Sequence, residues 1–472
     1  MVIKKRTQTK IKKVEKSAKR IAIIGGGWYG VHLSLVLQNK GYDVIILEEQ
    51  SNIMSVVSGT FGIRTHRSGL HYPRSRKAQE ICQRNYGKFC KDYPDLLVKN
   101  KHSIHAYLET DANGNPSKIS LNEFLEVCQR DPTSSFFDQY AHGYQGLSAA
   151  VSIDEPSILV GEPLREALRA RLSAAGVDVA YDYSVQEIKP SNNGQMCIAG
   201  INTRTRITTI NQFDRVINAT GFQHFIPDDF KSNPFGIKPI YQVCLGLVYE
   251  DTKPGAADEQ FTFLGLDGGH WAAMPCGKTN HGAAKYMITH GIHTILASCN
   301  ETIEAQSVVK KLNNSNFSER VRLYTEQEIE KYLPTFKKRF KYIKYEVAII
   351  AKPLTRTEFR CAFTFADSNR VIQVFPGKVT GIYDIEKEVL QLINDEQCEE
   401  KRGYSYIKGG VLDQANKEIQ DKPDPTTKEH NTCLLNPYPY LTGRASFWSR
   451  PPQPSKEEAS QPRYNHGLRN GE

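Results

Sequence analysis

The feature that most constrains this chain is a glycine pattern placed between a short β-branched run and a longer apolar run. The pattern is G-x-G-x-x-G, with glycines at Gly25, Gly27 and Gly30, and residues 21–24 before it are I-A-I-I. Taken alone such a pattern is weak evidence, but here a strand of the fully buried kind precedes it and a helical pattern follows it. Gly41 ends that helix, as glycine at the C′ position does. The sequence therefore predicts the first strand–turn–helix unit of a nucleotide-binding α/β fold.

The glycine turn predicts contact with a pyrophosphate. Gly25 permits the tight turn, Gly27 lets the backbone approach the phosphates, and Gly30 lets the helix pack closely on the strand. The phosphates would then face the unpaired N–H groups at the start of the helix. Glu48 follows the second buried strand, residues 44–47, and is placed to bind a ribose hydroxyl. An acid at this position also repels a 2′-phosphate, which disfavours NADP.

Further pieces of a nucleotide-binding domain lie far downstream. A helical pattern around residues 157–175 leads into an alternating run over 177–188, and a strand over 214–219 leads into Thr220 and Gly221. A strand over 371–375, a turn at 376–378 and a helix over 381–394 follow near the end. Because a simple NAD dehydrogenase keeps its nucleotide domain contiguous, these separated pieces favour FAD over NAD.

With these pieces in place, the sequence resembles the D-amino-acid-oxidase-like superfamily of FAD-dependent oxidoreductases over roughly residues 20–395. The resemblance implies an α/β fold with a discontinuous Rossmann-like FAD-binding domain. It also implies a mixed α+β substrate domain that carries an antiparallel sheet, and FAD as the cofactor. The expected boundaries are a basic disordered arm at 1–19, an FAD-binding domain at 20–75, 156–230 and 365–398, a substrate domain at 76–155 and 231–364, and a disordered tail at 399–472, where eight of the 23 prolines fall.

The resemblance also assigns cofactor contacts by position. The glycine turn would hold the pyrophosphate, Glu48 the adenosine ribose, and the backbone of Val185 the adenine. Lys378 and the helix after it would stabilise negative charge on the reduced flavin, although the lysine could instead point to solvent. The residues expected at the cofactor are Gly25, Gly27, Trp28, Tyr29, Gly30, Glu48, Val185, Thr220, Gly221, Gly377, Lys378, Val379 and Thr380.

A closer resemblance rests on three short motifs: G-W-Y-G at 27–30, G-L-H-Y-P-R-S at 69–75 and F-P-G-K-V-T at 375–380. In combination they look like a little-characterised bacterial subgroup of FAD-dependent oxidoreductases. The chain departs from the superfamily at residues 60–63, T-F-G-I, where small and amide residues usually lie beside the flavin.

The segment over 58–75 should run past the flavin and is rich in arginine and histidine. Arg64 or Arg74 would bind a substrate carboxylate or phosphate, and His66 or His71 would accept or relay a proton. The alternative is that these side chains pair with the FAD pyrophosphate or cap helices. Tyr241, and His270 or Trp271 in a second cluster over 267–275, could line the pocket, although a hairpin with a packed tryptophan is the favoured interpretation of that cluster.

These features predict an enzyme that transfers a hydride from a small amine, amino-acid or sugar-like substrate, anionic in character, to flavin N5. Two alternatives stay open. One is a non-redox flavoenzyme such as a sugar-nucleotide mutase, in which the arginines hold a diphosphate. The other is an FAD-fold binding or scaffold protein without turnover.

The charge distribution limits the partners. The formal net charge is +9, but residues 1–20 alone carry +8, so the body of the chain is close to neutral. This argues against a nucleic-acid partner, and leaves the basic arm to touch an anionic surface at most. None of the ten cysteines forms a C-x-x-C pair, no Cys/His cluster has metal-site spacing, and no segment is apolar enough to span a bilayer. We therefore expect no bound metal and a cytoplasmic location.

Overall fold

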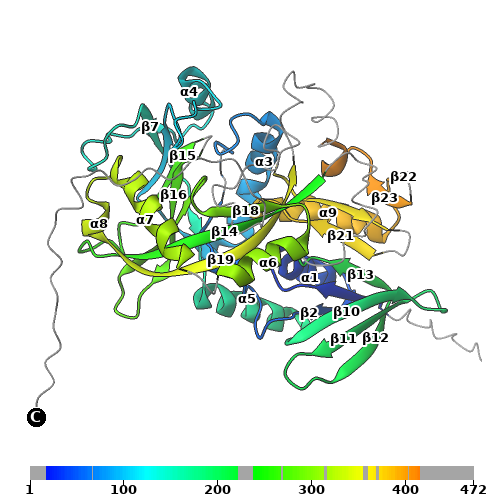
Figure 1. Ribbon diagram of the computed structural model, residues 1–472. Helices are drawn as coiled ribbons and strands as arrows, with labels where there is room; N and C mark the ends of the chain where they lie inside the picture. Colours follow the sequence, from blue (N-terminus) through cyan, green and yellow to red (C-terminus); the bar gives the residue numbers. More distant parts are fainter. Residues whose placement is uncertain are drawn as a thin grey trace, which may run out of the picture.

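The computed structural model describes residues 18–65, 67, 69–221, 238–266, 269–312, 316–354, 360–367, 371–401 and 403–414. Two large sheets organise these residues, and Figure 1 shows them beside each other, with most of the helices around them. The first sheet contains the glycine motif, and the second is the antiparallel sheet expected from the sequence.

The first sheet has the strand order β22-β23-β20-β21-β13-β1-β2-β9. Its five strands from β21 to β9 are parallel, so their carboxyl ends meet at one edge. The glycine turn, Glu48, Thr220 and Gly377 each follow one of these strands, and the topology therefore gathers them at that edge. The strands are β1 (Arg20–Ile24), β2 (Asp43–Leu47), β9 (Asp178–Ala180), β13 (Arg215–Asn218), β20 (Phe363–Ala366), β21 (Val371–Phe375), β22 (Cys398–Lys401) and β23 (Tyr404–Ile407).

This sheet is covered differently on its two faces. Ile21 and Ile23 of β1 pack in one cluster with residues of the helices α1 and α9. Ala22 and Ile24 point the other way, as alternate residues of a strand must, and pack in a cluster with the meander β10-β11-β12. Figure 1 shows this meander projecting at the lower right. These elements are α1 (Trp28–Asn39), α9 (Ile382–Ile393), β10 (Tyr183–Pro190), β11 (Met196–Asn202) and β12 (Thr208–Phe213). A further helix, α5 (Glu162–Ala175), precedes β9 in the chain.

The second sheet has the order β18-β14-β17-β16-β15-β5-β7-β6, and β19 pairs with β14. All its pairings are antiparallel except that of β5 with β15. The strands β5 to β7 precede α5 in the chain and β14 to β19 follow β13, so two separated stretches of chain join in this one sheet. Its strands are β5 (His102–Tyr107), β6 (Ser135–Phe136), β7 (Ala149–Ile153), β14 (Lys238–Asp251), β15 (Phe261–Leu266), β16 (Trp271–Lys278), β17 (Ala284–His290), β18 (Ile295–Cys299) and β19 (Phe340–Leu354).

Smaller elements connect the two sheets. A three-stranded sheet pairs residues 63–64 and 97–98 with residues 157–158, which lie just before α5. It consists of β3 (Ile63–Arg64), β8 (Ser157–Ile158) and β4 (Leu97–Val98), and the remaining helices are α2 (Val57–Thr60), α3 (Arg76–Asp92), η1 (Pro94–Leu96), α4 (Leu121–Gln129), α6 (Thr302–Leu312), α7 (Phe317–Glu330), α8 (Phe336–Arg339) and η3 (Val379–Gly381).

Two expected elements have different bounds in the structure. The helix expected around 157–175 begins only at Glu162, because Gly161 adopts a positive φ of 74° and Pro163 follows in the first turn. The strand expected over 177–188 is divided into β9 and β10, because Asp182 between them has φ 55°. Only β9 joins the parallel sheet.

Helix α3 contacts both parts of the fold. Ala78 and Ile81 in its first half pack in one cluster with residues of the second sheet, while Phe89 packs in another with Trp28 of α1 and Leu164 of α5. The boundary expected at residue 76 therefore stays a prediction. A sequence pattern gives the apolar face of α3 but not which neighbour covers it.

The first residues of the expected disordered tail, from 399 on, belong to the fold. Residues 398–407 form β22 and β23 at the edge of the first sheet, and Tyr404, Val411 and Leu412 are buried. The carboxylate of Glu388 on α9 accepts a hydrogen bond from the backbone N–H of Val411 at 2.6 Å, which fastens this segment to the fold. Residues 415–472 of the expected tail and 1–17 of the expected arm lie outside the described residues.

Candidate functional site

The glycine turn is built so tightly that side chains are excluded at two positions. Gly25 has φ +100°, and a Cβ there would lie 2.9 Å from the carbonyl oxygen of Ala219. A Cβ on Gly30 would lie 1.9 Å from the carbonyl oxygen of Gly25. The turn therefore requires glycine at both positions and leaves the start of α1 open at the carboxyl edge of the parallel sheet.

Glu48 is fastened to this turn. One carboxylate oxygen accepts the backbone N–H of Gly26 at 2.6 Å, and the other accepts that of Gln50 at 2.8 Å. Burial raises the pKa of Glu48 above its ordinary value, while these two donors act to lower it. Since each carboxylate oxygen can accept more than one hydrogen bond, a ribose hydroxyl fits beside these two contacts.

The C-terminal turn meets the glycine motif through Tyr29. Its hydroxyl donates to the carbonyl oxygen of Lys378 at 2.6 Å and accepts the backbone N–H of Gly377 at 3.2 Å. A Cβ on Gly377 would lie 2.1 Å from the backbone nitrogen of Ala362, so this turn also requires glycine. Segments about 350 positions apart are thus joined at one place, as the resemblance implied.

A third segment reaches the same edge. Asn218, at the end of β13, donates to the side chain of Gln373 on β21 at 2.7 Å. Its amide oxygen accepts both the backbone N–H and the hydroxyl of Thr220, at 3.2 and 2.7 Å. Gly221 follows with φ +82°, a conformation that favours glycine.

These groups fit a bound dinucleotide. Close-approach glycines line the turn, and the hydroxyl of Thr380 in η3 is fully buried and has no hydrogen-bond partner among the described residues. A polar atom of a bound ligand would give this buried hydroxyl the partner that such groups need. Gly25, Gly27 and Gly30 would hold the pyrophosphate, Glu48 the ribose, and residues 377–380 the flavin end. Val379, the neighbour of Thr380, is itself buried in the cluster around α1.

Two further residues expected at the cofactor lie on α1 and β10. The Trp28 ring packs against Phe89 and Tyr93, with centroids 5.6 and 5.7 Å away, and its buried indole N–H has no hydrogen-bond partner among the described residues. Its assignment to the cofactor stays a prediction. Val185 lies on β10 at a β-bulge, in the meander beside β2, where its backbone is the part suited to adenine.

The motif over 69–75 forms a turn held by the first turn of α3. Gly69 has φ +66°, and a Cβ there would lie 2.6 Å from Cα of Gln79. The Gln79 side-chain amide donates to the carbonyl oxygen of Tyr72 at 2.8 Å. Ser75 caps α3 by accepting the N–H of Ala78 at 3.2 Å. The sequence between these anchors, including His71, is therefore fixed in place.

His71 lies between this motif and the second sheet. Its half-buried ring is stacked with the Tyr72 ring at 5.7 Å and meets the His105 ring of β5 edge-on at 5.5 Å. The ammonium of Lys378 lies 5.0 Å from the centre of the Tyr72 ring. The structure thus brings together two of the short motifs, over 69–75 and 375–380, and adds His105.

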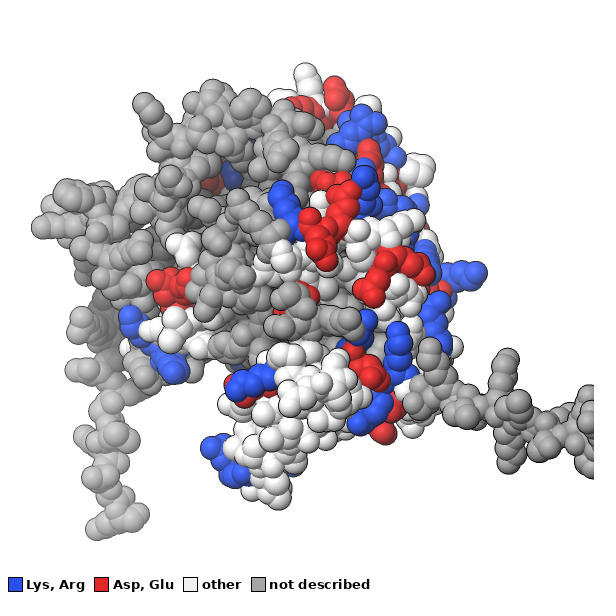
Figure 2. Space-filling model, turned by 90° about the vertical axis from the view of Figure 1, so that its right-hand side faces the viewer, with Lys and Arg blue, Asp and Glu red and all other residues white. Residues whose placement is uncertain are grey.

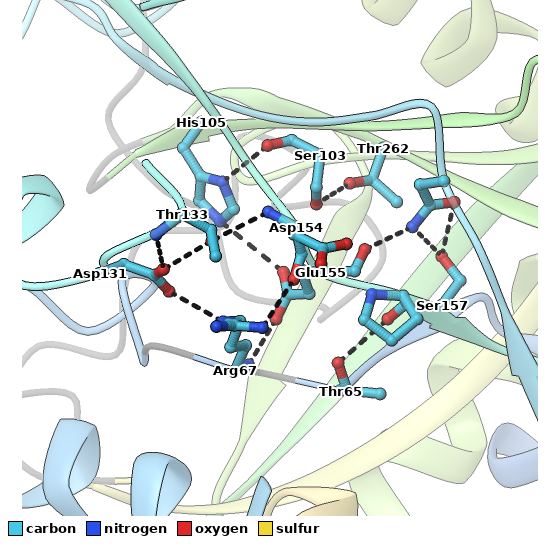
Figure 3. A network of polar contacts seen from close by, with 12 residues as sticks. Thr65, Arg67, Ser103, His105, Asp131, Thr133, Asp154, Glu155, Ser157 and Thr262 are labelled. Atoms are coloured by element: carbon cyan, nitrogen blue, oxygen red, sulfur yellow. Dashed lines mark hydrogen bonds and ion pairs between the residues drawn. The ribbon is translucent and has the colours of Figure 1, made fainter. Parts of the chain in front are cut away.

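Behind His71, a buried polar network extends from β5 to the start of β8 (Figure 3). The Nε2 atom of His105 lies 4.0 Å from a carboxylate oxygen of Glu155, and the other oxygen of Glu155 accepts the backbone N–H of Arg67 at 2.7 Å. Arg67 itself pairs with Asp131 at 3.4 Å. His105 and Glu155 carry no sequence motif, and only the alternation of β5 could have indicated that His105 points inward.

The other predicted catalytic residues are placed as follows. Arg64 pairs with Ser157 through its backbone in β3, and its side chain lies outside what the structure describes, as does all of His66. Arg74 is half-buried in the turn over 69–75. Tyr241 is buried in β14, in the core of the second sheet, opposite Cys299 of β18.

The second aromatic cluster is part of the core. Trp271 is stacked on Phe263 with centroids 3.9 Å apart, and Tyr144 continues the stack at 6.4 Å from Trp271. This agrees with the favoured interpretation of a packed tryptophan. His270 is also buried, while Asp267 lies outside the described residues.

The departure at 60–63 also has a structural reason. Phe61 packs in one cluster with Val248, Met287 and Ala348 of the second sheet. A Cβ on Gly62 would lie 2.7 Å from Cβ of Met274. These residues therefore connect the two sheets, since a bulky aromatic fills the contact and a glycine allows the close approach.

The surface carries charges of both signs. On the face in Figure 2, basic and acidic side chains of the described residues are interspersed, with no large area of one sign among them. In the described part of the chain, no three His, Cys, Asp or Glu side chains are grouped as metal ligands. None of the helices described is both long and apolar enough to cross a membrane.

The fold and the site define a flavoprotein whose FAD domain is assembled from separated segments. Residues 20–373 match the family model described as FAD dependent oxidoreductase, DAO. This chain belongs to that family, so it is an FAD-dependent oxidoreductase and FAD is its cofactor.

Relatives in curated collections point to the same class. The chain is 36% identical over 427 residues to the FAD-dependent monooxygenase kojA of Aspergillus flavus, which covers 89% of this chain and 97% of the relative. It is 24% identical over 378 residues to an FAD-dependent monooxygenase of Fusarium mangiferae, covering 80% of this chain and 91% of the relative. The family match confirms the superfamily resemblance. Because both of these relatives come from fungi, the expected bacterial subgroup stays a prediction.

Solved structures share the fold at low identity. Glycine oxidase from Geobacillus kaustophilus matches with a TM-score of 0.54 at 12% identity, over 80% of this chain and 96% of that one. The L-α-glycerophosphate oxidase of Mycoplasma pneumoniae, solved with FAD bound, matches with 0.54 at 11% identity, over 80% of this chain and 95% of that one.

Proposed function

We propose that this oxidoreductase oxidises a small organic substrate at a C–H bond next to nitrogen or oxygen. The substrate gives up a hydride and a proton and becomes an imine or a carbonyl compound. Bound FAD supplies the hydride acceptor at N5, and the chain supplies the proton acceptor and the orientation of the substrate. The observation that carries this proposal is the position of His71, whose ring meets the buried His105 ring and is stacked with the Tyr72 ring beneath Lys378.

In this proposal His71 accepts the proton. A neutral imidazole suits this role because its pKa lies near neutral pH, and its place in the fixed turn over 69–75 limits its motion. The turn over 69–75 leads into helix α3, whereas His105 belongs to the second sheet. His71 is therefore held where the two parts of the fold meet.

Arg74 binds an anionic group of the substrate in this proposal. It lies in the same turn as His71 and is half-buried, which keeps its guanidinium in reach of a ligand and partly out of water. A planar guanidinium binds a carboxylate or phosphate with two parallel hydrogen bonds. An anionic amine, amino acid or sugar derivative is the substrate class that fits.

A second candidate function is monooxygenation, which the names of the fungal relatives favour. One oxygen atom of O₂ would enter the substrate and the other would leave as water, with two electrons supplied by a reduced nicotinamide coenzyme. The two functions differ in the reactants that they consume and in the products that they release. An oxidase needs no coenzyme, and it releases peroxide when O₂ is the acceptor.

The experiment that separates them begins with the purified yellow protein under anaerobic conditions. Mixing it with amines, amino acids and sugar acids should bleach the flavin band at about 450 nm for a substrate of the proposed oxidation. A monooxygenase would leave the band unchanged and would instead consume coenzyme, O₂ and substrate in equal amounts. A mutase would do neither, and a colourless protein that takes up no FAD would contradict the cofactor assignment.

A further inference from the structure

The charged and polar groups behind His71 form an arrangement that the proposed reaction does not by itself require. His105 is 0% exposed and Glu155 is 2% exposed, yet they belong to different segments that meet beneath the turn over 69–75. Figure 3 shows the imidazole directed at the carboxylate. An ionised carboxylate at such depth is costly unless a cation or several donors compensate it.

Both ring nitrogens of His105 face oxygen atoms. Nδ1 lies 3.4 Å from the carbonyl oxygen of Ser103, and Nε2 lies 4.0 Å from Glu155. A carbonyl oxygen only accepts, and an ionised carboxylate only accepts, so the ring that matches both carries a proton on each nitrogen. The Ser103 hydroxyl does not compete for the ring, because it is paired with Thr262 at 2.6 Å.

The charged side chain of Arg67, which also lies near Glu155, is directed to other partners. The guanidinium of Arg67 is directed to Asp131 at 3.4 Å and to the carbonyl oxygen of Asp154 at 3.4 Å, while only its backbone N–H meets Glu155. The side chain of Asn100 holds the backbone carbonyl of Glu155 at 2.8 Å and so fixes the position of this residue. The His105 ring, in contrast, lies 4.0 Å from the Glu155 carboxylate through its Nε2 atom.

We propose that His105 and Glu155 form a buried ion pair whose imidazolium keeps His71 neutral and oriented to accept a proton. The edge-on contact at 5.5 Å places the positive ring of the pair next to His71, with Glu155 behind it. The ammonium of Lys378, over the adjacent Tyr72 ring, acts in the same direction. A positive neighbour disfavours a second positive charge, so the His105 imidazolium favours the neutral form of His71.

His105 and Glu155 are positioning residues in this scheme, because they act through His71. The inference rests on the proposed function only for the catalytic role of His71. The ion pair and its effect on His71 can be measured without a substrate.

The test uses the full-length holoenzyme with ¹⁵N-labelled histidine. His105→Asn and His71→Asn assign the two rings in the NMR spectrum. In the unaltered protein, His105 should show two protonated nitrogens even at about pH 8, where an ordinary histidine is neutral. A neutral His105 in the unaltered protein at this pH overturns the proposal.

Variants at Glu155 then test the link to His71. Glu155→Gln should make His105 neutral and raise the pKa of His71 by about one pH unit, whereas Glu155→Asp should keep His105 protonated. His142→Gln, which removes an exposed imidazole, serves as a control and should leave both signals unchanged. An unchanged or lowered His71 titration in Glu155→Gln contradicts the proposal. If these shifts occur but His71→Asn keeps full turnover, the result supports the ion pair and contradicts the catalytic role of His71.

Discussion

The hydroxyl of Tyr29 and the backbone of Lys378 are joined by a hydrogen bond of 2.6 Å across 349 positions of sequence. The same hydroxyl accepts the N–H of Gly377, so one side chain satisfies both groups of the C-terminal turn. Burial raises the pKa of Tyr29, which keeps the phenol protonated and able to donate. This side chain therefore joins the glycine motif to the C-terminal turn.

Replacing Tyr29 with Phe should therefore loosen the cofactor site. Two backbone groups lose a partner in a buried place, which should lower the free energy of unfolding by about 1–3 kcal/mol and weaken FAD binding. Thermal unfolding and FAD titration measure both effects. Tyr42→Phe is the matched control, because its hydroxyl makes only an exposed contact of 3.5 Å with Asn394. Equal behaviour of the two variants would contradict the role of Tyr29.

Gly30→Ala should abolish FAD binding. The added methyl would lie 1.9 Å from the carbonyl oxygen of Gly25, a distance that only movement of the turn or of α1 could relieve. Gly87→Ala, within α3 and with no atom within 4 Å of the added Cβ, is the control and should stabilise the protein by about 0.5–1 kcal/mol. Absorbance of the purified variants reports the bound flavin, and a yellow Gly30→Ala protein would show that the turn adapts.

Arg74→Ala should lower kcat/KM while FAD stays bound. The half-buried guanidinium is proposed to hold the substrate anion, and losing a charge-assisted bidentate contact costs about 1.5–3 kcal/mol, or roughly tenfold to a hundredfold in kcat/KM. Arg76→Ala, at an exposed position in the first turn of α3, is the control. Loss of FAD from Arg74→Ala would favour the alternative that this residue binds the cofactor.

Replacing Lys378 with Met should make the bound flavin harder to reduce. Loss of the positive charge at the C-terminal turn removes stabilisation of the reduced, anionic flavin. A loss of about 1 kcal/mol corresponds to a midpoint potential lower by about 20 mV for a two-electron couple. Spectroelectrochemical titration measures the potential, and Lys378→Arg, which keeps the charge, should behave as the unaltered protein. An unchanged potential in the Met variant would place the ammonium away from the flavin.

Glu388 should make the stability of the protein depend on pH. It is buried and accepts three hydrogen bonds from Thr364 and Val411, yet burial raises its pKa to about 7. Because the folded state holds the proton more tightly than the unfolded state, this contribution is complete below the ordinary pKa of 4.5 and is lost as the pH rises through about 7.

The unfolding temperature should accordingly fall between about pH 5 and about pH 7.5, and Glu388→Gln should flatten this dependence. Glu126→Gln on the exposed face of α4 is the control. Identical pH profiles for the unaltered protein and Glu388→Gln would show that another group is responsible.

The sequence by itself determined the local parts of the cofactor site. The spacing of Gly25, Gly27 and Gly30 expresses steric limits that act within a few residues, so the turn is present wherever that pattern joins a strand to a helix. Glu48 and the turn at Gly377 follow directly from the ends of buried strands, which hydrophobic patterns locate well. These local rules were enough to indicate FAD and an assembly from separated segments.

Only the tertiary structure decided which distant groups meet. The His105–Glu155 pair joins a residue of β5 to one in the connection between β7 and β8, 50 positions away, and no local pattern distinguishes them from any other buried histidine and glutamate. The same holds for Trp28, whose ring is covered by α3, and for residues 398–407, whose two short strands are stable only at the edge of an existing sheet. Burial and pairing of this kind depend on the neighbours that the whole fold supplies, because a side chain's environment is set by contacts across the chain and not by its own segment.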